Sequence, residues 1–258
     1  MIVVKTAMRS HVGKIRQVNE DNAWVDRIEH GLIAAVVADG MGGHKAGEIA
    51  SGLTVESVVA SLSSWQEDVE AADAEDRLKE LIRKANSVVF ETASGNDQYS
   101  NMGTTIVLAL LNRNAGLIGH IGDSRAYLLR DGELAQLTED HTLVQELTKS
   151  GQLSPEEAAN HPRRNVLLRA LGTDRSVEVD VRRFDWLPGD RLLLCSDGLS
   201  SLVEDALIRD TLSETNDTLE QKAEKLIALA LIAGGDDNVT VVLVDYEIDD
   251  VVGGGGKA

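Results

Sequence analysis

Residues 32–44 read LIAAVVADGMGGH, and this stretch decides the fold. The apolar run 32–38 has the length of a buried strand, and it ends at an aspartate, Asp39, that flexible residues follow. Strand ends are places where a rigid scaffold meets open space, so chemistry is often located there. We therefore expect a functional site beside Asp39.

The same arrangement recurs in residues 118–125 (IGHIGDSR) and 192–198 (LLLCSDG). A further pair of carboxylates lies on the other side of its strand, directly before residues 239–244. The aspartates at these boundaries are Asp39, Asp123, Asp197 and the pair Asp236–Asp237. Apolar strands bordered by aspartates predict one polar cluster at the rim of a sheet core.

The remaining hydrophobic patterns predict further strands and helices. Strands are expected at residues 2–9, 24–28, 105–111, 117–121, 126–129, 134–137, 177–184, 190–195 and 239–246. Helical spacing covers residues 49–62, 78–89, 203–212 and 219–232. The dipeptide Asp131–Gly132 is the best hairpin signal, because both positions tolerate positive φ. Successive hairpins indicate antiparallel pairing.

Residues 140–165 differ from this pattern because they are polar and lie between two blocks of strands. They contain a short helix pattern closed by Gly151, and then Ser154 followed by Pro155, which is a typical helix start. We expect this segment to form a mobile flap.

Length and composition favour one domain over residues 1–247, followed by a flexible tail over residues 248–258. No Pro/Ser-rich or charged linker divides the 258 residues. Hydrophobic residues make up 43% of the chain and aromatic residues only 3%, so we expect an aliphatic core and no aromatic platform for single-stranded nucleic acid. A net charge of -18 repels phosphate backbones and anionic lipid. Nucleic acid binding and membrane insertion are therefore not expected.

The single cysteine, Cys195, excludes an intramolecular disulfide and fits a reducing compartment. We interpret it as a small buried hydrophobe rather than a catalytic thiol. The N-terminus lacks the apolar region of a signal peptide, and no apolar run reaches membrane-spanning length. We expect a cytoplasmic protein.

If the strands are neighbours, the carboxylates at their ends converge, and they repel one another unless a cation neutralises them. This set comprises Asp39, Asp123, Asp197 and Asp237, and the pair Glu20–Asp21, which precedes the same sheet. Oxygen ligands select Mg²⁺ or Mn²⁺, and so many carboxylates favour a two-metal centre over a single ion. Asp39 is our candidate for the bridging ligand, and the Gly40 carbonyl is within reach of the same ions.

Basic and imidazole side chains near these acids each have a functional and a structural interpretation. Arg16 offers a guanidinium fork for phosphate oxygens, or forms a surface ion pair with Glu20. His44 is a proton donor or a hydrogen-bonded structural histidine, and His161 faces substrate from the flap or is simply exposed. His120, within an apolar strand, is interpreted as structural.

Together these segments form an ordered set of motifs. In chain order they are RQVNED (16–21), DGMGGH (39–44), MGTT (102–105), GDSRA (122–126), SDGL (196–199) and DNVT (237–240). The set resembles the metal-dependent PPM family of protein serine/threonine phosphatases, the type 2C phosphatases, and in particular their compact bacterial members. The resemblance extends from about residue 5 to residue 246.

The resemblance implies an α+β fold, a four-layer α-β-β-α sandwich of two antiparallel sheets flanked by pairs of helices, with the metal centre at one end. It also implies how the ligands are shared. Asp39, Asp197 and Asp237 would hold one ion, and Glu20, Asp39 and the Gly40 carbonyl the other, with Asp21 behind it through water. Asp123 and Asp197 would hold a weaker third ion, Arg16 would bind phosphate, and residues 140–165 would sense substrate.

Two positions depart from the family pattern. His11 stands where relatives often carry Asp, although no direct ligand is lost. Met41 stands where animal relatives place a general-acid histidine, as in bacterial members. The proton donor therefore stays open between His44 and a metal-bound water.

We accordingly predict direct hydrolysis of phosphoserine and phosphothreonine by a metal-bridging water, without a phosphoenzyme. The alternatives are a catalytically silent phosphoprotein-binding sensor with the same fold, and a phosphoesterase for small metabolites. By resemblance, the expected partners are phosphorylated proteins, including a bacterial Ser/Thr kinase that the enzyme opposes, and the chain is expected to be a monomer.

Overall fold

The computed structural model describes residues 2–28, 31–43, 45–65, 68–99 and 101–248. Within these residues the strands form two sheets, and every pairing between neighbouring strands is antiparallel. Sheet A contains, in spatial order, β1 (Ile2–His11), β11 (Val239–Ile248), β10 (Arg191–Cys195), β7 (Arg125–Arg130) and β8 (Glu133–Gln136). Sheet B contains β2 (Asp21–Arg27), β3 (Ile33–Met41), β5 (Ile106–Leu111), β6 (Ala115–Ile121) and β9 (Asp180–Asp185), and the short strand β4 (Gly103–Thr104) pairs with β3.

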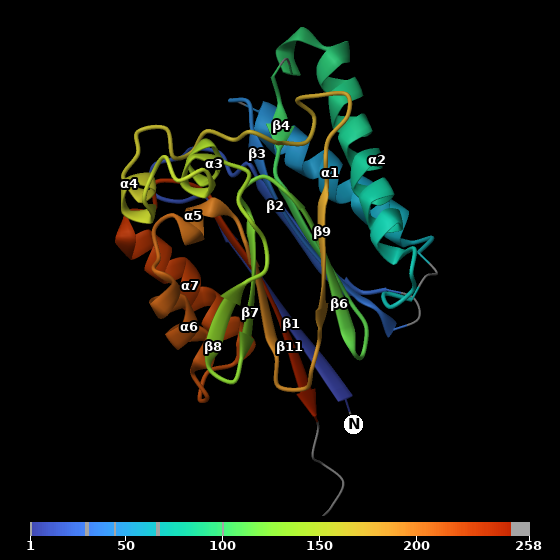
Figure 1. Ribbon diagram of the computed structural model, residues 1–258, viewed down its shortest axis with the longest axis vertical. Coiled ribbons are helices and arrows are strands. Elements are labelled where there is room, and N and C mark those ends of the chain that lie inside the picture. Colours follow the sequence, from blue (N-terminus) through green and yellow to red (C-terminus); the bar gives the residue numbers. More distant parts are fainter. Residues whose placement is uncertain (1, 29–30, 44, 66–67, 100, 249–258) are drawn as a thin grey trace, which may run out of the picture.

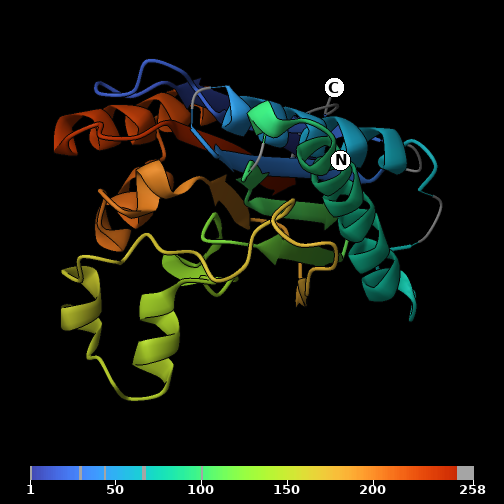
Figure 2. The same cartoon turned by 90° about the horizontal axis from the view of Figure 1, so that it is seen from above.

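Helices cover the outer face of each sheet (Figures 1 and 2). Sheet B packs against α1 (Ala46–Leu62) and α2 (Ala74–Gly95), and sheet A packs against α6 (Asp205–Ser213) and α7 (Leu219–Ala233). The shorter helices are η2 (Asp97–Tyr99), α3 (Leu143–Lys149), α4 (Pro155–Ala159) and α5 (Asp197–Ser200). The predicted four-layer sandwich is confirmed.

Strand β3 shows why its sequence is continuously apolar. Ala34, Val36 and Ala38 belong to the hydrophobic cluster beneath α1 and α2. The residues that alternate with them, Ile33, Ala35 and Val37, belong to the cluster between the two sheets. Successive side chains on a strand point to opposite faces, so a strand in the middle of four layers needs apolar residues on both.

Buried apolar positions place the helices on the sheets, and capping residues determine where the helices begin and end. At α7, Thr218 and Gln221 form a capping box at the N-terminus, and Gly234 follows the last turn with a φ of 151°. At α2, the buried positions repeat at helical spacing and pack on β6. A Cβ on Gly119 of β6 would lie 2.6 Å from Ile82 Cδ1, so this glycine lets α2 approach the sheet closely.

The segment 140–165 leaves the sandwich and carries α3 and α4, which project beyond the sheets (Figure 2). Thr142 caps α3, and Ser154 forms a capping box with Glu157 at α4. Neither helix contains a buried residue, and an isolated bridge between Thr142 and Leu167 closes the base of the segment. The predicted helix starts are confirmed, and the mobility of the flap stays a prediction.

Some elements differ from the prediction. The strand expected at 177–184 begins only at Asp180, because its partner β6 ends at Ile121 and the last pair is His120 with Asp180. The short strand β4 and the helical turn α5 had no expected counterpart. In each case the boundary depends on a partner that is distant in sequence.

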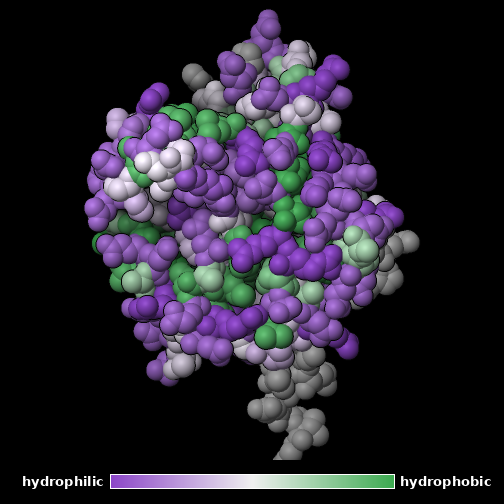
Figure 3. Space-filling model, in the orientation of Figure 1, coloured by the Kyte–Doolittle hydropathy of each residue, from purple (hydrophilic) through white to green (hydrophobic). Residues whose placement is uncertain are grey.

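The visible face in Figure 3 is mainly hydrophilic, in keeping with the large net charge. No helix in the described residues is both long and apolar enough to cross a membrane. Residues 249–258, most of the predicted tail, lie outside the described residues, as does His44.

Candidate metal centre

The predicted carboxylates meet at one end of the sandwich. Asp123 and Asp197 also line a cavity with the segment that carries α3 and α4, which lies next to α5 in Figure 1. The cavity that the carboxylates themselves line has a volume of about 240 Å³, and both sheets supply it. Its polar lining includes Arg16, Glu20, Asp39, Asp123, Asp197 and Asp237, together with the backbone of Gly40. The acids that were predicted to converge therefore do lie together in the structure.

Sheet B positions Asp39 through its neighbours on both sides. The register of β2 and β3 places Asp21 directly opposite Asp39. Thr105 accepts a hydrogen bond from the Asp39 amide at its hydroxyl (3.0 Å) and donates its own amide to the Asp39 carbonyl (2.8 Å). Asp39 is therefore fixed at the backbone while its carboxylate faces the cavity.

Gly40 follows Asp39 because nothing larger fits there. A Cβ at this position would lie 2.0 Å from the Gly47 carbonyl oxygen at the start of α1. The Gly40 amide donates to the Glu20 carbonyl (3.1 Å), and the hydroxyl of Ser51 on α1 donates to the same oxygen (2.6 Å). This close packing holds Glu20 and Gly40 side by side.

Sheet A contributes Asp197, which directly follows β10 and Ser196, and Asp237, which precedes β11. The Ser196 hydroxyl donates to Asp21 Oδ2 (2.7 Å) and accepts from the Thr240 amide (3.0 Å), so one serine connects the two sheets at the site. A Cβ on Gly198 would lie 1.9 Å from the Asn238 carbonyl oxygen. The ends of β10 and β11 are thus packed directly against each other.

The buried carboxylates have raised pKa values. Burial is the main cause of this rise, and repulsion from nearby carboxylates adds to it. The pKa of Asp21 rises to about 7, that of Asp123 to about 8 and that of Asp197 to about 6, and that of Asp39 is well above its ordinary value. Burial also raises the pKa of Glu20, although Arg16 opposes this. Without a cation, this cluster is held together only by keeping protons.

Unsatisfied oxygens show that the cluster fits a metal. Glu20 Oε1 and Asp21 Oδ1 are buried and have no hydrogen-bond partner among the described residues. A buried acceptor without a partner is costly unless a ligand satisfies it. Carboxylate and carbonyl oxygens are the donors that Mg²⁺ and Mn²⁺ prefer.

Arg16 lies at the mouth of the cavity with 47% of its side chain exposed. Its Nη2 donates to Asp237 Oδ2 at 2.7 Å, whereas its Nη1 is 3.9 Å from Glu20 Oε2. The ion pair expected with Glu20 is therefore secondary to one with Asp237. The side-chain amide of Asn238 fixes the loop that carries Arg16, because its Nδ2 donates to the Val12 and Val18 carbonyls.

A neighbouring cavity of about 410 Å³ opens between α5 and the α3–α4 segment. Asp123 and Asp197 line both cavities, so the second continues directly from the first. Asn165 also lines both, and Leu167 reaches the first. His161 lines neither cavity, so the structure gives its predicted substrate contact no support. The positions of Asn165 and Leu167 depend on how the segment folds back, which no local sequence signal reveals.

The protein-family model described as Protein phosphatase 2C matches residues 9–231. The chain belongs to the protein phosphatase 2C family. The serine/threonine phosphatase stp of Listeria monocytogenes is 42% identical over 244 residues, which cover 93% of this phosphatase and 95% of the relative.

Solved structures agree with this assignment. The S. agalactiae serine/threonine phosphatase superposes with a TM-score of 0.89 at 36% identity, covering 95% of this phosphatase and 100% of that chain. The catalytic domain of the phosphatase PstP, solved with two manganese ions, gives a TM-score of 0.83 at 39% identity. The match covers 96% of this phosphatase and 100% of that chain. The predicted family, enzyme class and metal dependence are confirmed: this phosphatase is a metal-dependent protein serine/threonine phosphatase.

Proposed function

We propose that this phosphatase hydrolyses phosphoserine and phosphothreonine esters directly, at the carboxylate cluster described above. The observation that carries the assignment of the site is the meeting of acids from β2, β3, the start of α5 and the residues before β11 around two buried, unsatisfied oxygens. At neutral pH, divalent cations would stabilise such an arrangement by neutralising carboxylates that otherwise retain protons.

The proposed ligands divide into two groups that share Asp39. Glu20, Asp39 and the Gly40 carbonyl would hold one ion, with Asp21 behind it through water. Asp39, Asp197 and Asp237 would hold the other. Divalent ions held by these residues would supply charge neutralisation for phosphoryl oxygens and would make a bound water more acidic, which is the chemistry the reaction needs.

A weaker third ion is proposed between Asp123 and Asp197. The support for it is that both carboxylates line the two adjoining cavities, and that each raises the pKa of its neighbours. Residues of the α3–α4 segment line the second cavity together with Asp123 and Asp197, so an ion held by these two carboxylates would lie where the main cluster adjoins that segment.

Arg16 supplies the proposed phosphate contact. Its guanidinium has a carboxylate partner in Asp237 and is half exposed, so it can turn towards an arriving phosphoryl group without crossing a buried region. Bidentate binding of phosphate by arginine fixes orientation as well as charge.

Attack by water rather than by a protein nucleophile is favoured by the state of Cys195. This thiol is fully buried, and burial raises its pKa to about 12. It is neither ionised nor accessible to a phosphopeptide. The proton donor for the leaving alkoxide stays open, because His44 lies outside the described residues.

The complete set of acidic ligands does not favour the silent-sensor alternative, and the family assignment favours phosphoproteins over small metabolites. We infer that the enzyme acts in the cytoplasm as a monomer. We also infer that it opposes a Ser/Thr kinase.

The test is the variant Asp39→Asn, assayed on a phosphothreonine peptide with Mn²⁺. Losing the shared ligand is expected to reduce kcat/KM by about 100-fold or more, since even changes to residues that only hydrogen-bond to a metal ligand cost about 10- to 100-fold. Asp26→Asn, an exposed change on β2, is the matched control and keeps wild-type activity. Unreduced turnover by Asp39→Asn would refute the assignment.

A further inference from the structure

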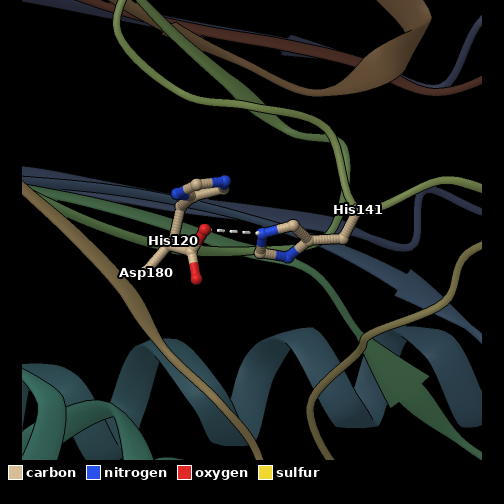
Figure 4. Close-up of side chains that lie close together, drawn as sticks. All are labelled: His120, His141 and Asp180. Carbon is tan, nitrogen blue, oxygen red and sulfur yellow. Dashed lines mark hydrogen bonds and ion pairs between the residues drawn. The ribbon is translucent and has the colours of Figure 1, made fainter. Parts of the chain in front are cut away.

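Three side chains with metal-ligand chemistry lie together away from the carboxylate cluster: His120, His141 and Asp180 (Figure 4). One ligand-type atom from each lies within 4.8 Å of the others. His120 comes from β6, Asp180 from the start of β9, and His141 from the residues that lead into α3. Both histidines are buried, and their rings stack with centroids 4.6 Å apart.

Hydrogen bonds assign the protons on His141. The Gly122 amide points at His141 Nδ1 (3.1 Å), and an N–H needs an acceptor, so Nδ1 carries no proton. The neutral ring then has its proton on Nε2, which donates to Asp180 Oδ2 (3.2 Å). Burial, followed by the nearby His120 and Arg169, lowers the pKa of His141 to about 4, so the ring is neutral at pH 7.

These bonds leave no open metal position on His141. The other oxygen of Asp180 accepts from Arg169 Nη1 (2.8 Å). His120 Nε2 lies 2.8 Å from the Glu139 carbonyl, which can only accept, so this nitrogen is also protonated. A metal on His141 would have to displace either the Gly122 amide or Asp180. Asp180 and His141 instead form a chain of oriented hydrogen bonds that ends at Gly122, and His120 stacks on the His141 ring.

His141 holds Gly122 from both of its backbone groups. The His141 amide donates to the Gly122 carbonyl (2.9 Å), while the ring accepts from the Gly122 amide. Gly122 has a φ of 104°, and a Cβ there would lie 2.6 Å from Thr105 Cγ2. The backbone at this point therefore has a single arrangement, and it determines the direction in which the next residue, Asp123, leaves the sheet.

The connections continue on both sides of Gly122. Beyond Asp123, the hydroxyls of Ser124 and Thr105 share a hydrogen bond (2.7 Å), and Thr105 accepts from the Asp39 amide. On the other side, the Leu168 amide donates to the His141 carbonyl (2.8 Å). His141 and Arg169 thus bracket the α3–α4 segment at its two ends.

We propose that His141, oriented by Asp180, is a positioning residue that fixes the turn at Gly122 and so holds Asp123 in the orientation in which it binds a divalent ion. The proposal rests on the assignment of Asp123 as a metal ligand above. It makes the base of the α3–α4 segment and the weaker ion site mechanically dependent on one another.

The first test reads the tautomer in the metal-free, full-length protein. Long-range ¹H–¹⁵N spectra of the histidine rings are expected to show an unprotonated Nδ1 and a protonated Nε2 on His141. Asp180→Ala is expected to weaken this preference, because only the Gly122 amide then selects the unprotonated Nδ1, and Asp180→Asn, whose amide oxygen still accepts, is expected to retain it. A protonated Nδ1 in the wild type, or ring signals shifted by stoichiometric Zn²⁺, would overturn the proposal in favour of a metal site.

The second test measures Mn²⁺ binding by calorimetry, and kcat and KM at increasing Mn²⁺. His141→Ala is expected to weaken the lowest-affinity Mn²⁺ site by about 10- to 100-fold, as for other residues that orient a ligand. Excess Mn²⁺ should recover kcat. His141→Asn places an amide oxygen near the position of Nδ1 and is expected to restore most of the affinity. Asp185→Asn, an exposed change at the other end of β9, is the control.

The outcomes separate this proposal from the proposed function. Wild-type protein without Mn²⁺-dependent phosphatase activity would count against the function and leave the tautomer test unaffected. Active wild type with unchanged Mn²⁺ affinity in a folded His141→Ala would overturn the positioning role alone. If His141→Ala does not fold, the His141→Asn and Asp180→Ala titrations decide: wild-type Mn²⁺ affinity in Asp180→Ala contradicts the proposal.

Discussion

Metal-free enzyme is expected to lose stability as the pH rises from about 6.5 to about 8. Burial and neighbouring carboxylates raise the pKa of Asp123 from 3.8 to about 8, so the folded state keeps a proton that the unfolded state has already lost. Stability falls with rising pH wherever the native state binds more protons than the unfolded state. The buried histidines His120 and His141 oppose this fall only in the lower part of the window, because their lowered pKa values add stability with rising pH until the unfolded histidines have lost their protons, about one unit above the ordinary histidine value.

The size of the effect follows from the shift. Across this window, Asp123 alone contributes roughly 1 to 2 kcal/mol, because stability falls with rising pH while its carboxyl stays protonated in the folded state. Asp21, with a pKa of about 7, and Asp39 act in the same direction. For a protein of this length, 1 kcal/mol shifts Tm by about 2 to 4 °C, so Tm should fall by about 2 to 8 °C.

Differential scanning fluorimetry of chelator-treated protein measures this directly. The same pH series with saturating Mn²⁺ is the control, and there the loss is expected to be much smaller because the ions hold the carboxylates ionised. The stabilisation by Mn²⁺ should therefore grow with pH. A metal-free Tm that is constant or rises across the window would refute the electrostatic reasoning.

Two further changes test other parts of the account. Arg16→Ala should raise KM or lower kcat/KM for a phosphothreonine peptide by about 10-fold or more, from the loss of one charge-assisted contact of roughly 1.5 to 3 kcal/mol; identical steady-state kinetics would remove Arg16 from substrate binding. Cys195→Ala should lower stability by about 1 to 2 kcal/mol in a denaturant titration and leave kcat essentially unchanged, because the thiol is buried and protonated; loss of turnover in folded protein would instead point to a thiol nucleophile.

Much of the fold could be predicted from local patterns. The seven-residue apolar run 32–38 predicted a strand buried on both faces, and β3 distributes its side chains between two clusters accordingly. Turn and cap signals at Asp131–Gly132 and Ser154–Pro155 also lie where they were expected. These features depend on residues close together in the chain, which is why one sequence is enough to find them.

The acids of the site could be predicted, but their exact neighbours could not. That Asp21 stands opposite Asp39 follows from strand register, and that Ser196 bonds Asp21 follows from the packing of two sheets. Arg16 pairs with Asp237, a residue 221 positions away, rather than with the nearer Glu20. Sequence spacing predicted Glu20 as the partner of Arg16, but the fold brings Asp237 closer to its guanidinium.

The role of His141 was hidden for the same reason. Nothing beside it in the sequence indicates that its ring meets the amide of Gly122, 19 residues before it, and the carboxylate of Asp180, 39 residues after it. His120 was interpreted as structural from its apolar surroundings, and its burial and its bond to the Glu139 carbonyl agree with that.

The most direct measurement of the central claim is anomalous diffraction at the manganese edge from crystals of wild-type protein grown with Mn²⁺. The account predicts two strong peaks that share Asp39, with Glu20 beside one and Asp197 and Asp237 beside the other, and a weaker peak near Asp123. Crystals that diffract well and show no anomalous density among these carboxylates would contradict it.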